Sequence, residues 1–305
     1  MGRSGRLVAL VGPTATGKSQ LGLDLAEALD AEIIGADAMA LYCGMDIGTA
    51  KTPPNQRRGI AHHLIDVLEV TQEASVAAYQ RYARLAAEQI WSRGKTAIVV
   101  GGSGLYLRAM LDQIDFPATD PQIRAKWLEK AQTDGPQALH QELSRLDPSA
   151  AAVIEPGNTR RLARALEVIE LTGQPFKAQL PKPQAWRPLV YLGLDLEDDL
   201  LDQRIASRVA GMWQAGLLEE VAALDRQGLR QGKTAARAIG YQQGLAVLDG
   251  LLTEEQAQAS MTLATCQLAR RQRKWFRREG RINWLDTSAP LGQAALALIN
   301  AHSWD

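Results

Sequence analysis

The sequence predicts an α/β fold with a mostly parallel sheet that is interrupted by an α-helical insertion. Continuous apolar runs at 7–11 and 96–100 are typical of strands that a parallel sheet buries on both faces. Segments with helical spacing of apolar residues, at 19–29 and 74–93, lie between these runs. Because strands and helices alternate along the chain, the core is predicted to be doubly wound.

The pattern changes in the middle of the chain. From about 120 to 177 the sequence is charged and helical, without a recognisable strand, and several prolines then mark a linker. A strand pattern returns at Leu189, long helices follow to about Gly280, and a last strand is expected at 281–285. We therefore divide the chain into a core made of 1–111 and 188–305 and an insertion made of 112–187.

Composition sets few limits on function. Of the 305 residues, 46% are hydrophobic, and 34 basic residues balance 34 acidic ones, so the net charge neither supports nor excludes a polyanionic partner. Two cysteines, Cys43 and Cys266, are too few for a disulfide framework and fit a reducing compartment. The run at 7–11 is too short for a signal peptide and no other stretch could span a membrane, so we expect a cytoplasmic protein.

The first apolar run leads directly into a phosphate-binding motif. Residues 12–19 match G-x-x-x-x-G-K-[ST], and a helical pattern follows, which is the context that this motif requires. Backbone N–H groups and the helix N-terminus bind phosphate oxygens, the lysine adds a positive charge, and the hydroxyl of Ser19 can bind Mg²⁺. The motif predicts a P-loop NTPase-like core in which these residues hold a diphosphate or polyphosphate: Gly12, Pro13, Thr14, Ala15, Thr16, Gly17, Lys18 and Ser19.

The reaction on that phosphate is indicated by a missing residue. An NTPase normally has an apolar strand that ends in an aspartate, which assists Mg²⁺. The best candidate strand here, at 96–100, ends in Gly101-Gly102-Ser103 instead. This difference counts against hydrolysis and favours a group transfer in which diphosphate is the leaving group.

Several further blocks carry a resemblance to a known family. With the P-loop, they follow one another in the family's order along nearly the whole chain, and the sequence closely resembles the bacterial tRNA dimethylallyltransferases, also called tRNA isopentenyltransferases. The blocks are Asp37–Tyr42, Gly44–Lys51, His62–Asp66, Gly101–Leu107, Asp147-Pro148, Arg164–Val168, Gly216-Leu217 with Glu219–Val221, Ile239–Tyr241 and Gln267–Gln272.

The resemblance implies a specific reaction. The family transfers a dimethylallyl group from dimethylallyl diphosphate to N6 of the adenosine on the 3′ side of the anticodon, in tRNAs that read codons beginning with U. The P-loop would hold the donor's diphosphate with Mg²⁺ at one end of a channel, and the flipped adenine would enter from the other end. The insertion would contact the anticodon stem-loop. We expect the protein to act as a monomer.

Four positions depart from the family's usual residues. Ala38 stands in place of Ser and removes a possible hydrogen bond beside Asp37, whereas Ser103, in place of Thr, keeps the hydroxyl. Thr52 replaces a Pro and Cys266 replaces an Arg. We therefore expect changes in contacts with tRNA rather than a different reaction.

Asp37 is the candidate catalytic base. It follows the apolar run at 31–34, at the sheet edge where α/β proteins bind ligands. The exocyclic amine of adenine is a poor nucleophile, and a carboxylate that takes its proton assists the attack. The alternative interpretation is a turn aspartate that binds nearby backbone amides. The resemblance favours catalysis and adds Ser103 to the catalytic residues.

Arg208 is the candidate partner of the leaving group. It lies four residues after Arg204 on a predicted helix, and no carboxylate occupies the positions three or four away from either residue. Like charges at this spacing destabilise a helix, so an anion elsewhere is expected. The resemblance makes that anion the departing diphosphate for Arg208; the alternative is a distant Asp or Glu.

Basic clusters predict contacts with tRNA. Arg270, Lys274, Arg277 and Arg281 fall on one helical stripe that only Glu279 interrupts, so phosphate binding is favoured over a solvated face of mixed charge. A second cluster joins Arg160, Arg161 and Arg164, although Arg164 has Glu167 within reach. The resemblance adds further tRNA contacts at Asp37, Ala38, Met39, Ala40, Ser103 and Arg124.

Three other functions remain open at this stage. The P-loop alone allows a kinase that binds ATP, a related prenyltransferase could modify free adenine nucleotides, and a nucleotide-binding module could lack catalysis. The basic clusters favour tRNA over the first two, and Asp37 with Arg208 argues against the third. His62 and His63 point to opposite faces of a strand, so they are not a metal pair.

Overall fold

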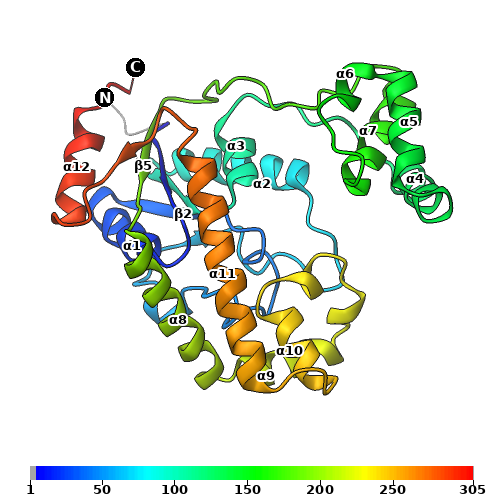
Figure 1. Ribbon diagram of the computed structural model, residues 1–305. Coiled ribbons are helices and arrows are strands. Elements are labelled where there is room, and N and C mark those ends of the chain that lie inside the picture. The colour runs from blue at the N-terminus through cyan, green and yellow to red at the C-terminus, as the bar shows by residue number, and fades with distance from the viewer. Residues whose placement is uncertain (1–4, 305) are drawn as a thin grey trace. The chain divides into compact units, whose positions relative to one another are not determined.

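A six-stranded parallel sheet forms the centre of the computed structural model, which describes residues 5–304 (Figure 1). Its strands are β1 (Leu7–Val11), β2 (Ala31–Gly35), β3 (His62–His63), β4 (Thr96–Gly101), β5 (Leu189–Gly193) and β6 (Asn283–Trp284). They lie in the order β3-β2-β4-β1-β5-β6, and every pair is parallel. The predicted α/β class with a parallel sheet is confirmed.

Helices cover both faces of this sheet, which explains the continuous apolar runs. Leu7, Ala9 and Val11 of β1 pack into one cluster, with residues of the helices α2 (Val76–Ser92) and α3 (Gly104–Leu111). Val8 and Leu10 point the other way and pack with α1 (Lys18–Leu29) and α12 (Leu291–Ala301). All five β1 residues are fully buried, as expected of a central strand with no solvent-facing side.

The C-terminal half adds helices beyond the sheet. In Figure 1, the long helix α11 runs beside α8, and both lie next to the sheet. The helical elements of this part are α8 (Asp198–Gln214), α9 (Leu217–Arg226), α10 (Tyr241–Leu248) and α11 (Glu254–Phe276), with 3₁₀ turns η1 (Pro54–Gln56), η2 (Leu229–Gln231) and η3 (Ala235–Arg237).

The insertion folds as a separate helical unit. The chain divides into one unit of 1–112 with 185–305, of which the structure describes 5–112 and 185–304, and a second unit of 113–184. The second unit contains α4 (Pro121–Asp134), α5 (Pro136–Leu146), α6 (Pro148–Ala151) and α7 (Thr159–Thr172) and no strand. Its core includes Trp127, Leu139 and Leu162. The expected boundaries, 112 and 187, differ from the observed ones by a few residues.

Two expectations about the C-terminal half were wrong. The last strand spans only Asn283–Trp284 rather than 281–285, because only these two residues pair with β5. Helix α11 ends at Phe276, so Arg281 does not continue its basic stripe. Instead, Arg281 forms ion pairs with Asp112 and Glu279.

Two simpler expectations concern the cysteines and the membrane. Cys43 and Cys266 are both free thiols. Within residues 5–304, no helix combines the length and the apolar character that crossing a membrane needs.

Candidate active site

Three neighbouring strands bring the predicted site together. β4 lies between β1 and β2, and all three are parallel, so their carboxyl ends meet at one edge of the sheet. The P-loop follows β1, Asp37 follows β2 by two residues, and Ser103 follows β4 by two residues. The edge that the sequence indicated as a ligand site therefore carries all three.

The P-loop depends on backbone conformations that most residues avoid. Gly12 has a φ of 144°, and a Cβ there would lie 2.1 Å from the carbonyl oxygen of Leu194. Gly17, with a φ of 96°, ends the loop just before α1. Thr16 Oγ1 donates a 2.9 Å hydrogen bond to the Pro13 carbonyl and closes the loop on itself. The turn thus keeps its shape without any contribution from a ligand.

Lys18 carries a strongly perturbed ammonium group. Its Nζ donates a 2.5 Å hydrogen bond to the Pro13 carbonyl. Burial, and then the positive charge of Arg208, lower the pKa of Lys18 to about 7, while Asp37 acts in the opposite direction. A bound anion would remove much of this penalty, so the electrostatics of the loop favour a negatively charged ligand.

Arg208 reaches the P-loop from α8. Its Nη1 donates to Thr14 Oγ1 at 3.3 Å. In the part of the chain that the structure describes, neither Arg208 nor Lys18 forms an ion pair with a carboxylate. The alternative partner for Arg208, a distant Asp or Glu, is therefore not found there.

Asp37 combines both interpretations that the sequence allowed. Its Oδ1 accepts a 2.9 Å hydrogen bond from Met39 N, which is a turn contact. Its Oδ2 has no hydrogen-bond partner among residues 5–304. Ser103 supports the same turn, because its Oγ accepts a 3.3 Å hydrogen bond from Ala38 N. One carboxylate oxygen thus fixes the side chain, and the other is available to a substrate.

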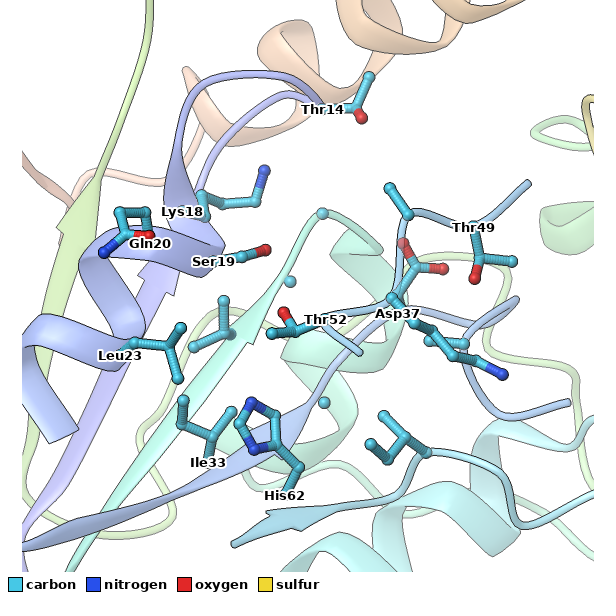
Figure 2. Close-up of a pocket in the computed structure, with 18 of the residues that line it drawn as sticks. Thr14, Lys18, Ser19, Gln20, Leu23, Ile33, Asp37, Thr49, Thr52 and His62 are labelled. Carbon is cyan, nitrogen blue, oxygen red and sulfur yellow. The ribbon is translucent and has the colours of Figure 1, made fainter. Parts of the chain in front are cut away.

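A cavity of about 400 Å³ joins these groups. Figure 2 shows Ser19 and Lys18 on one side of it, with the Ser19 hydroxyl directed into the space that separates the P-loop from Asp37. Thr49 and Thr52 line the opposite wall. Arg208, Met39's neighbour Ala40 and the glycines after β4 also contribute to the lining, but Ser103 does not.

Gln272 of α11 links two parts of the site, a role that the sequence did not reveal. Its Oε1 accepts from Thr14 N at 2.9 Å, and its Nε2 donates to the Gly102 carbonyl at 3.0 Å. A Cβ on Gly102 would lie 2.5 Å from that Nε2. The Gly-Gly pair after β4 was a visible signal that another group comes close, but its partner is 170 residues away.

The basic run on α11 is less exposed to a ligand than its sequence indicated. Arg270 pairs with Asp202 at 2.7 Å, and Arg277 pairs with Asp195 at 2.8 Å. These carboxylates come from α8 and the segment before it, so helical spacing within the run could not show them. Lys274 is exposed and has no ion pair within the described residues.

The arginines of the insertion also differ from one another. Arg124 and Arg164 each lie 2.9 Å from the fully buried carboxylate of Glu167. Burial alone would raise the pKa of Glu167, but hydrogen bonds from Thr119 and the two arginines lower it to about 2. Arg161 donates to the Ala178 carbonyl, and Arg160 is exposed. Arg160 and Arg161 are therefore the more accessible cations of this cluster.

No metal centre of side chains accompanies the site. Residues 5–304 contain no group of three or more His, Cys, Asp or Glu side chains placed to hold a metal. His62 Nδ1 contacts the Ile60 carbonyl at 2.9 Å, and His63 Nε2 contacts Glu32 at 2.7 Å. The two histidines thus have separate partners, in agreement with their opposite directions on β3.

Comparisons with known proteins place this site in a family. A family model described as IPP transferase matches residues 40–279. The tRNA dimethylallyltransferase of Thermobifida fusca is 53% identical over 303 residues, which covers 97% of this chain and 95% of that protein. The chain therefore belongs to the IPP transferase family.

Solved structures agree with this assignment. The full-length tRNA isopentenylpyrophosphate transferase of Bacillus halodurans matches with a TM-score of 0.70 and 38% identity, over 97% of this chain and 94% of that one. A eukaryotic dimethylallyltransferase acting on tRNA matches with a TM-score of 0.81 and 29% identity, over 95% of this chain and 75% of that one.

Proposed function

We infer that this protein is a tRNA dimethylallyltransferase. It transfers a dimethylallyl group from dimethylallyl diphosphate to N6 of the adenosine 3′ to the anticodon, in tRNAs that read codons beginning with U, and releases diphosphate. The observation that carries this inference is one cavity with two unpaired cations, Lys18 and Arg208, on one side and the carboxylate of Asp37 on the other. As the sequence led us to expect, we place this activity in the cytoplasm and in a monomer.

The donor's diphosphate belongs in the P-loop. Backbone N–H groups of residues 12–19 and the N-terminus of α1 suit phosphate oxygens, and Lys18 and Arg208 supply positive charge. Arg208 contacts Thr14 across the loop opening, so its guanidinium lies where a leaving diphosphate accumulates charge.

The residues present also fit Mg²⁺. Ser19 lines the cavity, and its hydroxyl has no hydrogen-bond partner in the described chain, so it can accept a cation. Mg²⁺ is commonly held by one or two protein oxygens together with phosphates and water, which needs no cluster of carboxylates. When bound, the ion neutralises charge on the diphosphate as the bond to the prenyl carbon breaks.

Asp37 performs the proton transfer. The N6 lone pair forms a bond to C1 of the prenyl group while the bond from C1 to the diphosphate oxygen breaks, and Oδ2 of Asp37 takes the N6 proton. Met39 N and the Ala38–Ser103 contact hold the carboxylate in place, so its orientation needs little reorganisation during the reaction. Ser103 is accordingly a residue that supports the catalytic turn.

The tRNA contacts are proposed for the insertion and for α11. Arg160, Arg161 and Lys274 are exposed cations that can bind phosphates directly. Arg270 and Arg277 can do so only by exchanging Asp202 and Asp195 for phosphate, which reduces their net contribution. The remaining proposed contacts are Asp37, Ala38, Met39, Ala40, Ser103, Arg124 and Arg164.

Nucleoside analysis tests this function directly. The protein is incubated with dimethylallyl diphosphate or with ATP, each with and without tRNA, and the digested nucleosides are analysed by mass. We expect a dimethylallyl increment on adenosine only with tRNA and the prenyl donor together. Modification of free adenine nucleotides, or phosphate transfer from ATP, would instead support one of the alternative enzymes.

A further inference from the structure

The wall of the cavity opposite the P-loop is a single loop, residues 45–52. Thr49, Lys51 and Thr52 of this loop line the cavity. The loop contains no regular helix or strand, so hydrogen bonds within the sheet or a helix do not fix its position. Its placement must come from other contacts, and these come from a part of the chain about 170 residues later.

One carboxylate receives three consecutive backbone groups of this loop. Glu220 Oε2 accepts from Asp46 N at 3.0 Å and from Ile47 N at 2.8 Å. Glu220 Oε1 accepts from Gly48 N at 3.2 Å. Glu220 lies in the first turn of α9, where the helix dipole favours a negative charge. Because amide bonds to an ionised group are stronger than neutral ones, this contact orders the loop backbone.

Tyr241 completes the same cluster. Its hydroxyl donates a 2.6 Å hydrogen bond to Glu220 Oε1, and the ring is fully buried. A Cβ on Gly48 would lie 2.6 Å from this ring, so only glycine fits at that point of the loop. The blocks that contain Gly48, Glu220 and Tyr241 in the sequence thus form one packing unit.

The other end of the loop is fixed separately. Lys51 is almost fully buried and its Nζ contacts the Tyr42 carbonyl, Asp46 and Asp66. The stretch that lines the cavity, from Thr49 to Thr52, therefore begins at the groups held by Glu220 and ends beside a buried ammonium. Neither anchor contacts the P-loop, and neither involves Asp37.

We propose that Glu220 is a positioning residue that sets the wall of the donor cavity through the backbone of residues 46–48. The proposal rests on the donor occupying this cavity. Loss of the Glu220 contact lets the wall move away from the P-loop and weakens the fit of the donor. The catalytic turn at Asp37 is held by other groups, so the chemical step at saturating donor is retained.

Substitution of neighbouring glutamates tests this role. Glu219 lies in the same turn of α9, is exposed, and does not contact the loop, so Glu219→Gln is a control with the same charge change. Glu220→Gln should raise the donor KM about tenfold, which corresponds to about 1.4 kcal/mol. The tRNA KM and the single-turnover rate at saturating donor should match those of Glu219→Gln. Equal donor KM values for the two variants would overturn the proposal.

Two further variants separate the possible failures. Tyr241→Phe keeps the buried ring and removes one hydrogen bond, so it should raise the donor KM less than Glu220→Gln does. If Glu220→Gln does not fold, a folded Tyr241→Phe with the parent donor KM contradicts the role. Lys18→Ala tests the placement of the donor itself: an unchanged donor KM in that variant means that the donor binds elsewhere, whatever Glu220 does.

Discussion

Lys18 makes donor binding depend on pH in a direction that the structure defines. Its pKa is about 7 in the free protein, against an ordinary value of 10.5, because of burial and then the charge of Arg208. The charged form binds diphosphate, and the negative charge of the ligand raises the pKa in the complex. Protons are therefore taken up on binding at any pH between the free and the bound pKa.

The size of this effect follows from the pKa. At pH 8 a group with a pKa of about 7 is neutral in about nine molecules of ten, so about 0.9 proton should enter per donor bound. The apparent affinity should be highest below pH 7 and fall by about 50-fold between pH 7 and pH 9, if the bound pKa lies above 9. The donor's own phosphates are fully ionised by pH 8, so they contribute little to the uptake.

Calorimetry measures this uptake. The observed heat of binding at pH 8 is recorded in buffers with different ionisation enthalpies, and its slope gives the number of protons. Lys18→Met, which keeps the length of the side chain, should abolish the uptake, and Arg204→Met, on the same helix as Arg208, should keep it. Uptake below about 0.2 proton in the parent protein, or an affinity that stays level from pH 7 to 9, would refute this reasoning.

Two further predictions concern catalysis and tRNA. Asp37→Asn should lower the single-turnover rate at saturating substrates by about 10²–10⁴, because Asn cannot take the N6 proton, with tRNA affinity unchanged; Ala38→Ser is the control, and a parent rate in Asp37→Asn would leave Asp37 as a turn residue only. Replacing Arg270, Lys274 and Arg277 together by Gln should reduce the salt dependence of tRNA binding by up to about 0.7–0.9 per lost phosphate contact, and Lys274→Gln alone should account for about one contact. Donor affinity should stay constant in both variants, and an unchanged salt slope would show that α11 does not contact tRNA.

The parts of the site that the sequence predicted are those set by local patterns. The P-loop could be predicted because its residues are contiguous and lie between a buried strand and a helix. Asp37 could be placed because strands of a parallel sheet end at the same edge, whatever their order. The sequence could not decide between turn and catalysis for Asp37, and the structure shows why: the two oxygens of one carboxylate have different surroundings.

Contacts between distant segments could not be predicted. Glu220 and the loop at 46–48 are more than 170 residues apart, and Gln272 and Thr14 are 258 apart. The carboxylates that pair with Arg270 and Arg277 come from other elements, so the apparent excess of positive charge on α11 was an effect of counting charges along one helix. Helical spacing describes which residues share a face, but it does not show what packs against that face.

The distribution of ion pairs itself supports placing the diphosphate at Lys18 and Arg208. Arg270 and Arg277 have carboxylate partners, so little electrostatic energy is gained when an anion approaches them. Lys18 and Arg208 have none in the described chain, and each is close enough to disturb the other, since Arg208 contributes to the lowered pKa of Lys18. Their mutual repulsion raises the free energy of the empty site, and an anion between them relieves it. The same two charges then face the diphosphate as it leaves, when its negative charge is largest, so the arrangement favours the transition state more than the bound donor.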